Sequence, residues 1–83
     1  MNLEDTIQAF VMRKYVEPAR AEGLQQISLT VAEVQQAMKL ESNLAEIARV
    51  LSSLEFERYA QVRLLRRRGP HMGGNLSFQF KIL

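Results

Sequence analysis

The sequence of 83 residues contains no cysteine and no tryptophan, and it has a single histidine. Without cysteine there is no disulfide bond, no zinc–thiolate site and no thiol redox motif. No apolar run approaches the roughly 18–20 residues of a membrane-spanning helix, and the N-terminus lacks the basic start and apolar stretch of a signal peptide. The sequence therefore predicts one small domain, spanning residues 1–83, with a cytoplasmic location and no membrane partner.

Residues that carry catalysis or hold a cofactor are equally scarce. No glycine-rich phosphate loop ending in lysine opens a helix. His71 lies in a glycine-rich stretch, and no cysteine or serine stands in a context that would make it a nucleophile. One histidine and scattered carboxylates do not form a metal-binding set. We therefore expect no enzyme activity, no metal and no cofactor, and we expect His71 to be an exposed loop residue.

Acidic residues are missing from the C-terminal third of the chain. Residues 1–57 hold all nine acids and five bases, a net charge of −4, whereas residues 58–83 hold six bases and no acid. The overall charge of +2 hides this segregation. Such asymmetry predicts an electropositive surface that faces a polyanion, either nucleic acid or an acidic protein. The plainer alternative is a solvated basic hairpin with no partner.

The first helix is expected over residues 3–17, where apolar residues recur at helical spacing. Asn2 is placed to cap its N-terminus. Pro18 should stop or kink it, because proline lacks the backbone N–H and clashes with the preceding turn. Residues 18–22 would then add at most one further turn, which Gly23 would close.

Two further helices follow, over residues 31–40 and 43–55. The first of these begins at a T-x-x-E capping box that starts at Thr30 and is accompanied by a hydrophobic staple. The second is expected to be capped by either Ser42 or Asn43. A turn of roughly three residues separates them, which is the spacing of a helix-turn-helix.

The hydrophobic period changes from 3.6 to 2 after Phe56. Alternating residues predict a hairpin of two half-buried strands, 58–66 and 76–82, joined by a loop rich in glycine. A short strand at 26–29 can pair with this hairpin. The four phenylalanines are expected in the core: Phe10, Phe56, Phe78 and Phe80.

The residues from the capping box at Thr30 to Arg58, followed by the basic hairpin Val62–Gly69, resemble the winged helix-turn-helix fold. More narrowly, the run Ile47–Arg58 is similar to the C-terminal winged-helix tails of phage and plasmid primase-helicase proteins. The resemblance implies an α+β domain of three helices, a short strand and a C-terminal hairpin wing. This chain has Glu55 where the family usually has glycine, so another ending of the recognition helix is expected.

A helix-turn-helix places its second helix in the major groove of duplex DNA. Arg49 on that helix is the best candidate to read guanine, unless it forms an ion pair with Glu46 on a solvated face. The outer face of the helix is expected to carry Val50 and Ser53 as well. The predicted nucleic-acid-binding residues are Ser42, Asn43, Arg49, Ser53, Arg63, Arg66, Arg67, Arg68, His71 and Lys81.

The helix carries little positive charge, so most of the affinity should come from the hairpin and should depend strongly on salt. These features predict a small transcription regulator or a replication-associated domain. The alternative is an interaction module whose basic hairpin binds an acidic protein partner. A homodimer through the first helix, with Met12 and Tyr15 on its outer side, is a further expectation.

Overall fold

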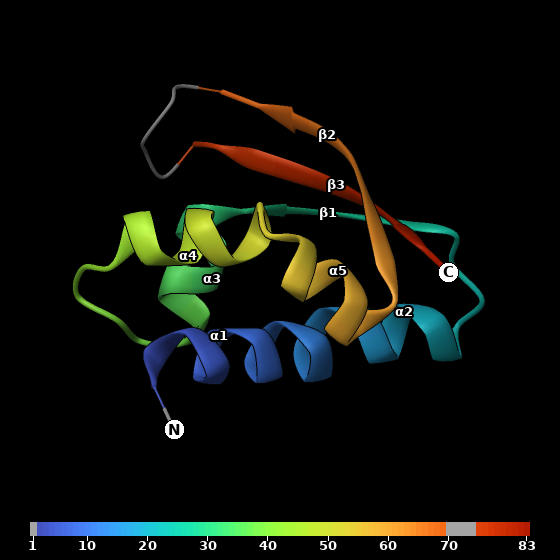
Figure 1. Cartoon of the computed structure of the whole chain (residues 1–83), viewed down its shortest axis with the longest axis horizontal. Helices are drawn as coiled ribbons and strands as arrows, with labels where there is room; N and C mark the ends of the chain where they lie inside the picture. The colour runs from blue at the N-terminus through green and yellow to red at the C-terminus, as the bar shows by residue number, and fades with distance from the viewer. Residues whose placement is uncertain (1, 70–74) are drawn as a thin grey trace.

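The structure, a computed structural model, describes residues 2–69 and 75–83. It is an α+β domain in which helices form one layer and a three-stranded antiparallel sheet forms the other (Figure 1). In chain order the elements are α1 (Leu3–Val11), the π-helical segment η1 (Met12–Val16), α2 (Glu17–Ala21), β1 (Gln26–Thr30), α3 (Val31–Ala37), α4 (Leu44–Leu51), α5 (Leu54–Ala60), β2 (Val62–Arg68) and β3 (Ser77–Ile82). Within these described ranges, no helix has the length and apolar character to cross a membrane.

The first helix begins as expected but continues past Pro18. The Asn2 side chain accepts a hydrogen bond from the Asp5 N–H at 2.8 Å, which confirms the predicted cap. The turn before the proline widens into η1, where the Glu17 N–H donates to the carbonyl of Met12, five residues earlier. A wider turn relieves the clash that a proline ring makes with the carbonyl four residues before it. The helix therefore does not stop at residue 17. The alternative expectation, a kink at the proline followed by one further turn, agrees with η1 and α2.

The helical path ends at Gly23, which has φ +76°. The Gly23 N–H donates to Arg20 and the Leu24 N–H donates to Ala19, the pair of bonds that defines a Schellman motif. The Arg20 guanidinium in turn donates to the carbonyl of Ala60 at 2.9 Å. That contact neutralises the exposed carbonyls at the end of α5 and fixes α5 against α2.

Both hydrogen bonds of the predicted capping box are present at the start of α3. The Glu33 N–H donates to the Thr30 hydroxyl at 3.1 Å, and the Thr30 N–H donates to the Glu33 carboxylate at 2.8 Å. The helix ends at Ala37, earlier than the predicted residue 40. Lys39 adopts a left-handed conformation with φ 59°, and the N–H groups around it close a Schellman motif. The turn to α4 is consequently longer than three residues.

The helix predicted over residues 43–55 is two helices. α4 ends at Leu51, and Ser53 starts α5 by accepting a hydrogen bond from the Phe56 N–H at 3.1 Å. Glu55 lies in the first turn of α5, where a negative charge is favourable at a helix N-terminus. The predicted side-chain cap at Asn43 is absent, since Asn43 has φ 79° and its side chain makes no capping bond.

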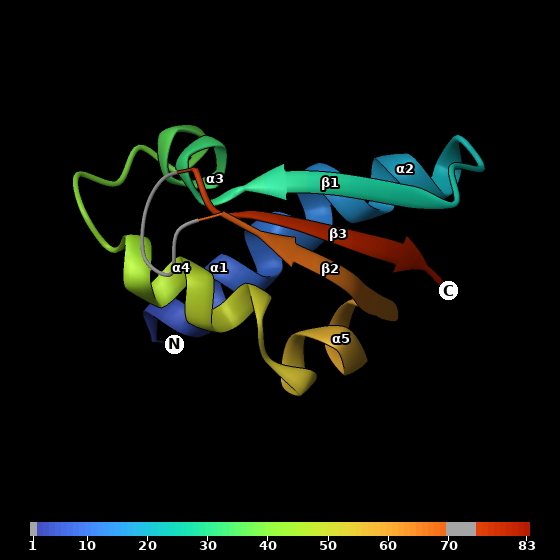
Figure 2. The same cartoon turned by 90° about the horizontal axis from the view of Figure 1, so that it is seen from above.

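The sheet has the strand order β1-β3-β2, with both pairings antiparallel. All helices lie on one side of it, and Figure 2 shows the strands passing over α1. β2 starts at Val62 rather than at residue 58, because residues up to Ala60 belong to α5. Gln61 turns the chain between them with φ 56°.

The core lies between the sheet and the helices. Phe56, Phe78 and Phe80 are buried, and their rings contact one another with centroids 5.5 Å apart for Phe56–Phe80 and 6.3 Å for Phe78–Phe80. Phe10 is only half-buried and meets the Tyr15 ring edge-on, so its predicted place in the core is wrong. Burial raises the pKa of the Tyr15 phenol, and nearby Glu33 raises it further.

Candidate nucleic-acid interface

β2 contains one residue more than the part of β3 that it pairs with. Leu64 lies opposite Phe80 and Arg66 lies opposite Gln79, so Leu65 is an extra residue without a partner. This β-bulge shifts every later residue of β2 by one position relative to regular alternation. It thereby decides which arginines lie on which face of the sheet.

The two faces of the sheet are identified by burial on β3, because successive residues of a strand point to opposite sides. Phe78 and Phe80 are buried against the helices, so Gln79 lies on the side away from them, called the outer face. The outer face consists of Gln26, Ser28 and Thr30 on β1, Arg63, Arg66 and Arg68 on β2, and Ser77, Gln79 and Lys81 on β3. The outer face thus gathers four of the predicted binding residues: Arg63, Arg66, Arg68 and Lys81.

Arg67 lies on the opposite side of the sheet, where it is paired with Phe78. Its guanidinium carbon is 5.7 Å from the centroid of the Phe78 ring, which is cation–π distance. Arg67 and Arg49 together line a groove of about 310 Å³ between β2 and α4. The rest of that groove is lined by small residues, namely Ala45, Ala48 and Ser52. We call these five residues the helix groove.

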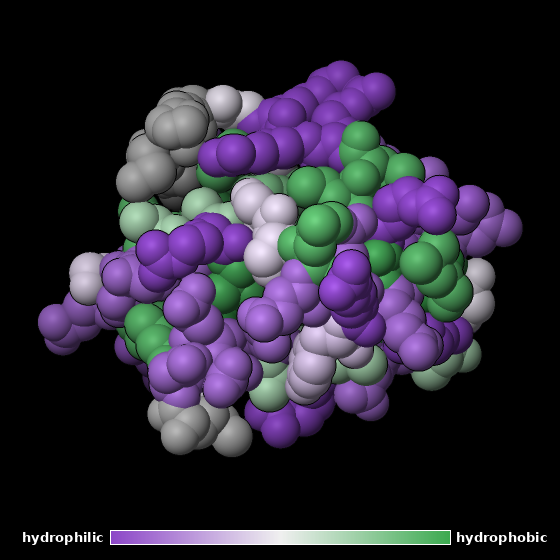
Figure 3. All heavy atoms as spheres, viewed as in Figure 1, coloured by the Kyte–Doolittle hydropathy of each residue, from purple (hydrophilic) through white to green (hydrophobic). Residues whose placement is uncertain are grey.

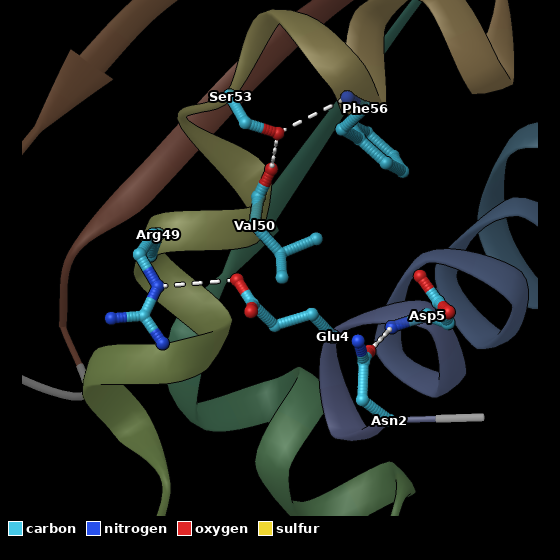
Figure 4. A network of polar contacts seen from close by, with 7 residues as sticks. All are labelled: Asn2, Glu4, Asp5, Arg49, Val50, Ser53 and Phe56. Atoms are coloured by element: carbon cyan, nitrogen blue, oxygen red, sulfur yellow. Dashed lines mark hydrogen bonds and ion pairs between the residues drawn. The ribbon is translucent and has the colours of Figure 1, made fainter.

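Arg49 forms an ion pair with Glu4 of α1 rather than with Glu46. The Arg49 Nε donates to a Glu4 carboxylate oxygen at 3.2 Å (Figure 4). The two side chains are 63% and 48% exposed, so water screens the pair and it contributes little to stability. The guanidinium is therefore held beside α4 by a contact that a stronger anion can replace.

The exposed side of α4 is narrower than the sequence suggested. Ala45, Arg49 and the adjoining Ser52 are exposed, whereas Val50 is only 2% exposed and belongs to the core. The Ser53 hydroxyl donates to the Val50 carbonyl at 2.8 Å while it caps α5, as Figure 4 shows. Ser53 thus lies in the turn between two helices and not on the outer face of a recognition helix.

Ser42 and Asn43 precede α4 and shape its entry. The Ser42 carbonyl accepts a hydrogen bond from the Gln35 side chain at 3.2 Å, which ties the turn to α3. The Ser42 hydroxyl donates to the Asn43 side chain at 3.4 Å. Both residues therefore stabilise the turn that leads into α4, and these contacts do not involve a ligand.

The arginines and the lysine among the predicted binding residues fall into two groups on opposite sides of the sheet. One group lies on the outer face, and the other is the pair Arg49 and Arg67 in the helix groove. Ser42, Asn43 and Ser53 belong to neither group, and His71 lies outside the described residues. Sequence reasoning missed this division because it assumed regular alternation, although the doubled Leu64-Leu65 in an alternating strand is the signal of a bulge.

The described residues hold no cluster of three or more histidine, aspartate or glutamate side chains that could bind a metal. They also contain no buried side-chain nitrogen or oxygen that lacks a hydrogen-bond partner. The outer face and the helix groove both contain exposed arginines with hydroxyl groups beside them. No protein-family model, curated protein or solved structure matches the chain.

Proposed function

We propose that this chain is a winged helix-turn-helix module that binds duplex DNA through the helix groove. The fold assignment is supported by the order of elements, with β1 before α3 and α4 and with β1 joined to the final hairpin through β3. α3 and α4 are consecutive helices in contact, as in a helix-turn-helix. The domain is a small regulator or a replication-associated module.

The observation that supports the proposal most directly is that Arg49 and Arg67 line the same shallow groove. Arg49 comes from the exposed side of α4, and Arg67 comes from the strand beside it. The residues between them are small, so a phosphate backbone or a base edge can approach α4 closely. Arg49 is placed to bond guanine in the major groove while Arg67 contacts phosphate.

The proposal predicts weak sequence preference and strong dependence on salt. Each arginine that neutralises a phosphate steepens the dependence of log affinity on log salt by about 0.9. The test is fluorescence anisotropy of a short labelled duplex over a series of potassium chloride concentrations. Arg67→Ala should weaken binding to all duplexes alike, whereas Arg49→Ala should also change the preference among them.

Arg13→Ala is the matched control, because it removes one exposed arginine from η1, away from the helix groove. It should lower affinity much less than Arg67→Ala does. If the wild-type protein does not bind duplex DNA at low salt, the proposal fails. If the Arg49 and Arg13 variants behave alike, α4 does not read DNA.

A second candidate function is favoured by one observation. A Glu4 carboxylate oxygen lies 3.2 Å from the Arg49 Nε, so α1 places a negative charge beside α4 at the very place where a phosphate would bind. A protein-interaction module, with the basic strands gripping an acidic partner, would tolerate that charge better. Failure to bind DNA, together with salt-sensitive binding to an acidic protein, would favour this alternative.

A further inference from the structure

The outer face of the sheet is an open surface that the proposed function does not use. The helices all lie on the other side of the strands in Figure 1, and Figure 3 shows hydrophilic side chains along the top of the same view, where β2 runs. The residues that define the outer face are polar or basic throughout.

The charge on the outer face has one sign. Arg63, Arg66, Arg68 and Lys81 are all exposed, and the three strands contain no aspartate or glutamate. The ion pair between Arg49 and Glu4 lies in the helical layer. At the edge of the sheet the Glu57 carboxylate accepts a hydrogen bond from the Leu64 N–H at 2.9 Å, so β2 has one acidic neighbour, which the four cations of the outer face outnumber.

The outer face also contains a small pocket. A pocket of about 200 Å³ is lined by Ser28, Arg66, Arg68, Ser77, Phe78 and Gln79. Arg66 and Arg68 stand two residues apart on one strand, so their stems are about 6.6 Å apart along it. Two guanidinium groups with hydroxyl and amide groups beside them supply the donors that phosphate oxygens accept.

We infer that the outer face is a second nucleic-acid-binding surface, which holds the sugar-phosphate backbone of a segment other than the one at the helix groove. A protein partner fits less well, because protein interfaces rely on buried apolar or aromatic anchors, whereas the paired residues of the outer face are polar or basic and Leu65 at the bulge is a single exposed apolar side chain. Phe78 lines the pocket but is only 1% exposed, so it offers no ring face on which a base could stack, and the contacts are independent of sequence.

Arg67 and the outer-face arginines lie on opposite faces of the sheet, in a body that measures 32 × 29 × 21 Å. Separate faces allow one copy of the domain to hold two segments together, one against α4 and one against the outer face. This goes beyond the proposed function because it uses a different set of residues.

The experiment compares two double variants that each remove two arginines. Arg66→Ala/Arg68→Ala alters only the outer face, and Arg49→Ala/Arg67→Ala alters only the helix groove. Anisotropy with one labelled duplex gives the salt dependence, and energy transfer between two differently labelled duplexes reports bridging. Mass photometry of the complexes shows whether one protein copy bridges, and circular dichroism confirms that each variant is folded.

The wild-type protein should bridge two duplexes as a single copy, and each double variant should bind DNA but lose the energy transfer. The outer-face variant should lower the slope of log affinity against log salt by about 1.8, because two phosphate contacts are lost. Arg66→Lys/Arg68→Lys keeps the charge and should restore most of that slope. These results would support the second surface.

An outer-face variant with unchanged salt slope and unchanged energy transfer would overturn the inference. Bridging that requires two protein copies would also overturn it. If the helix-groove variant behaves like the wild type while the outer-face variant loses binding, the proposed function fails and the outer face stands as the DNA-binding surface. Absence of any binding to duplex DNA at low salt would refute both.

Discussion

Asn43 sets the start of α4 through its backbone rather than through its side chain. It has φ 79° and ψ 22°, and its carbonyl accepts the first hydrogen bond of the helix from the Ile47 N–H at 3.1 Å. The left-handed conformation costs most residues roughly 1–2 kcal/mol, and asparagine is among the few that adopt it routinely. Asparagine is therefore selected here for its conformation.

Replacement of Asn43 by serine tests whether the residue is favoured for its left-handed backbone conformation or for side-chain capping. Serine caps a helix about as well as asparagine but tolerates the left-handed region less well. Asn43→Ser should therefore lower the free energy of unfolding by about 1 kcal/mol, or roughly 4–8 °C in Tm for a domain of this size. Asn43→Gly should be close to neutral, since relief of the backbone is offset by about 0.5–1 kcal/mol of lost chain entropy.

The assay is urea unfolding followed by far-ultraviolet circular dichroism, with equal m-values required across the variants. Ser42→Ala is the control, because it removes only a long contact at 3.4 Å to the Asn43 side chain and should leave the midpoint nearly unchanged. The reasoning is refuted if Asn43→Ser is as stable as the wild type. That result would mean that the positive φ does not determine which residue is favoured at this position.

Three other substitutions test separate features of the structure. Gly69 has φ +117°, and a Cβ there would lie 3.0 Å from a backbone oxygen across the hairpin, so Gly69→Ala should lower Tm by several degrees and cost about 1–3 kcal/mol. Ser53→Ala removes the cap of α5 and should cost about 1 kcal/mol in urea unfolding; an unchanged midpoint would show that α5 does not need it. Glu4→Gln releases Arg49 from a screened ion pair worth about 0.2–1 kcal/mol, so duplex binding should become roughly 1.4- to 5-fold tighter. Glu22→Gln is the control, because it changes the net charge by the same amount. Equal effects of Glu4→Gln and Glu22→Gln on duplex binding would contradict a specific role for the Arg49–Glu4 pair.

Local sequence signals were sufficient where a single turn determines the structure. The capping box at Thr30 and the cap at Asn2 are both present, because each depends only on residues within one helical turn. The strand at 26–29 and the antiparallel hairpin were likewise predicted from alternation. The α+β class follows from these elements together, whereas the arrangement of helix groove and outer face does not.

The break between α4 and α5 was missed because the apolar pattern continues across it. Leu51 and Leu54 are three residues apart, which is helical spacing, so periodicity alone cannot detect a new helix. The available signal was Ser53 followed by acidic residues, a serine cap with negative charge in the first turn. Glu55, noted as a departure from the glycine of winged-helix proteins, is explained by that same extra helix.

The most consequential difference from the sequence prediction is the single extra residue at Leu65. Regular alternation from Leu64 would direct Arg66 and Arg68 toward the helices, to the side on which Phe78 and Phe80 are buried. The bulge reverses this, because it places both arginines on the solvent side and leaves only Arg67 to lie over the Phe78 ring. The position of the bulge therefore determines on which face of the sheet each of these arginines lies. The basic excess of the C-terminal segment becomes two separate surfaces, and a search for one DNA-binding face would have combined residues that point in opposite directions.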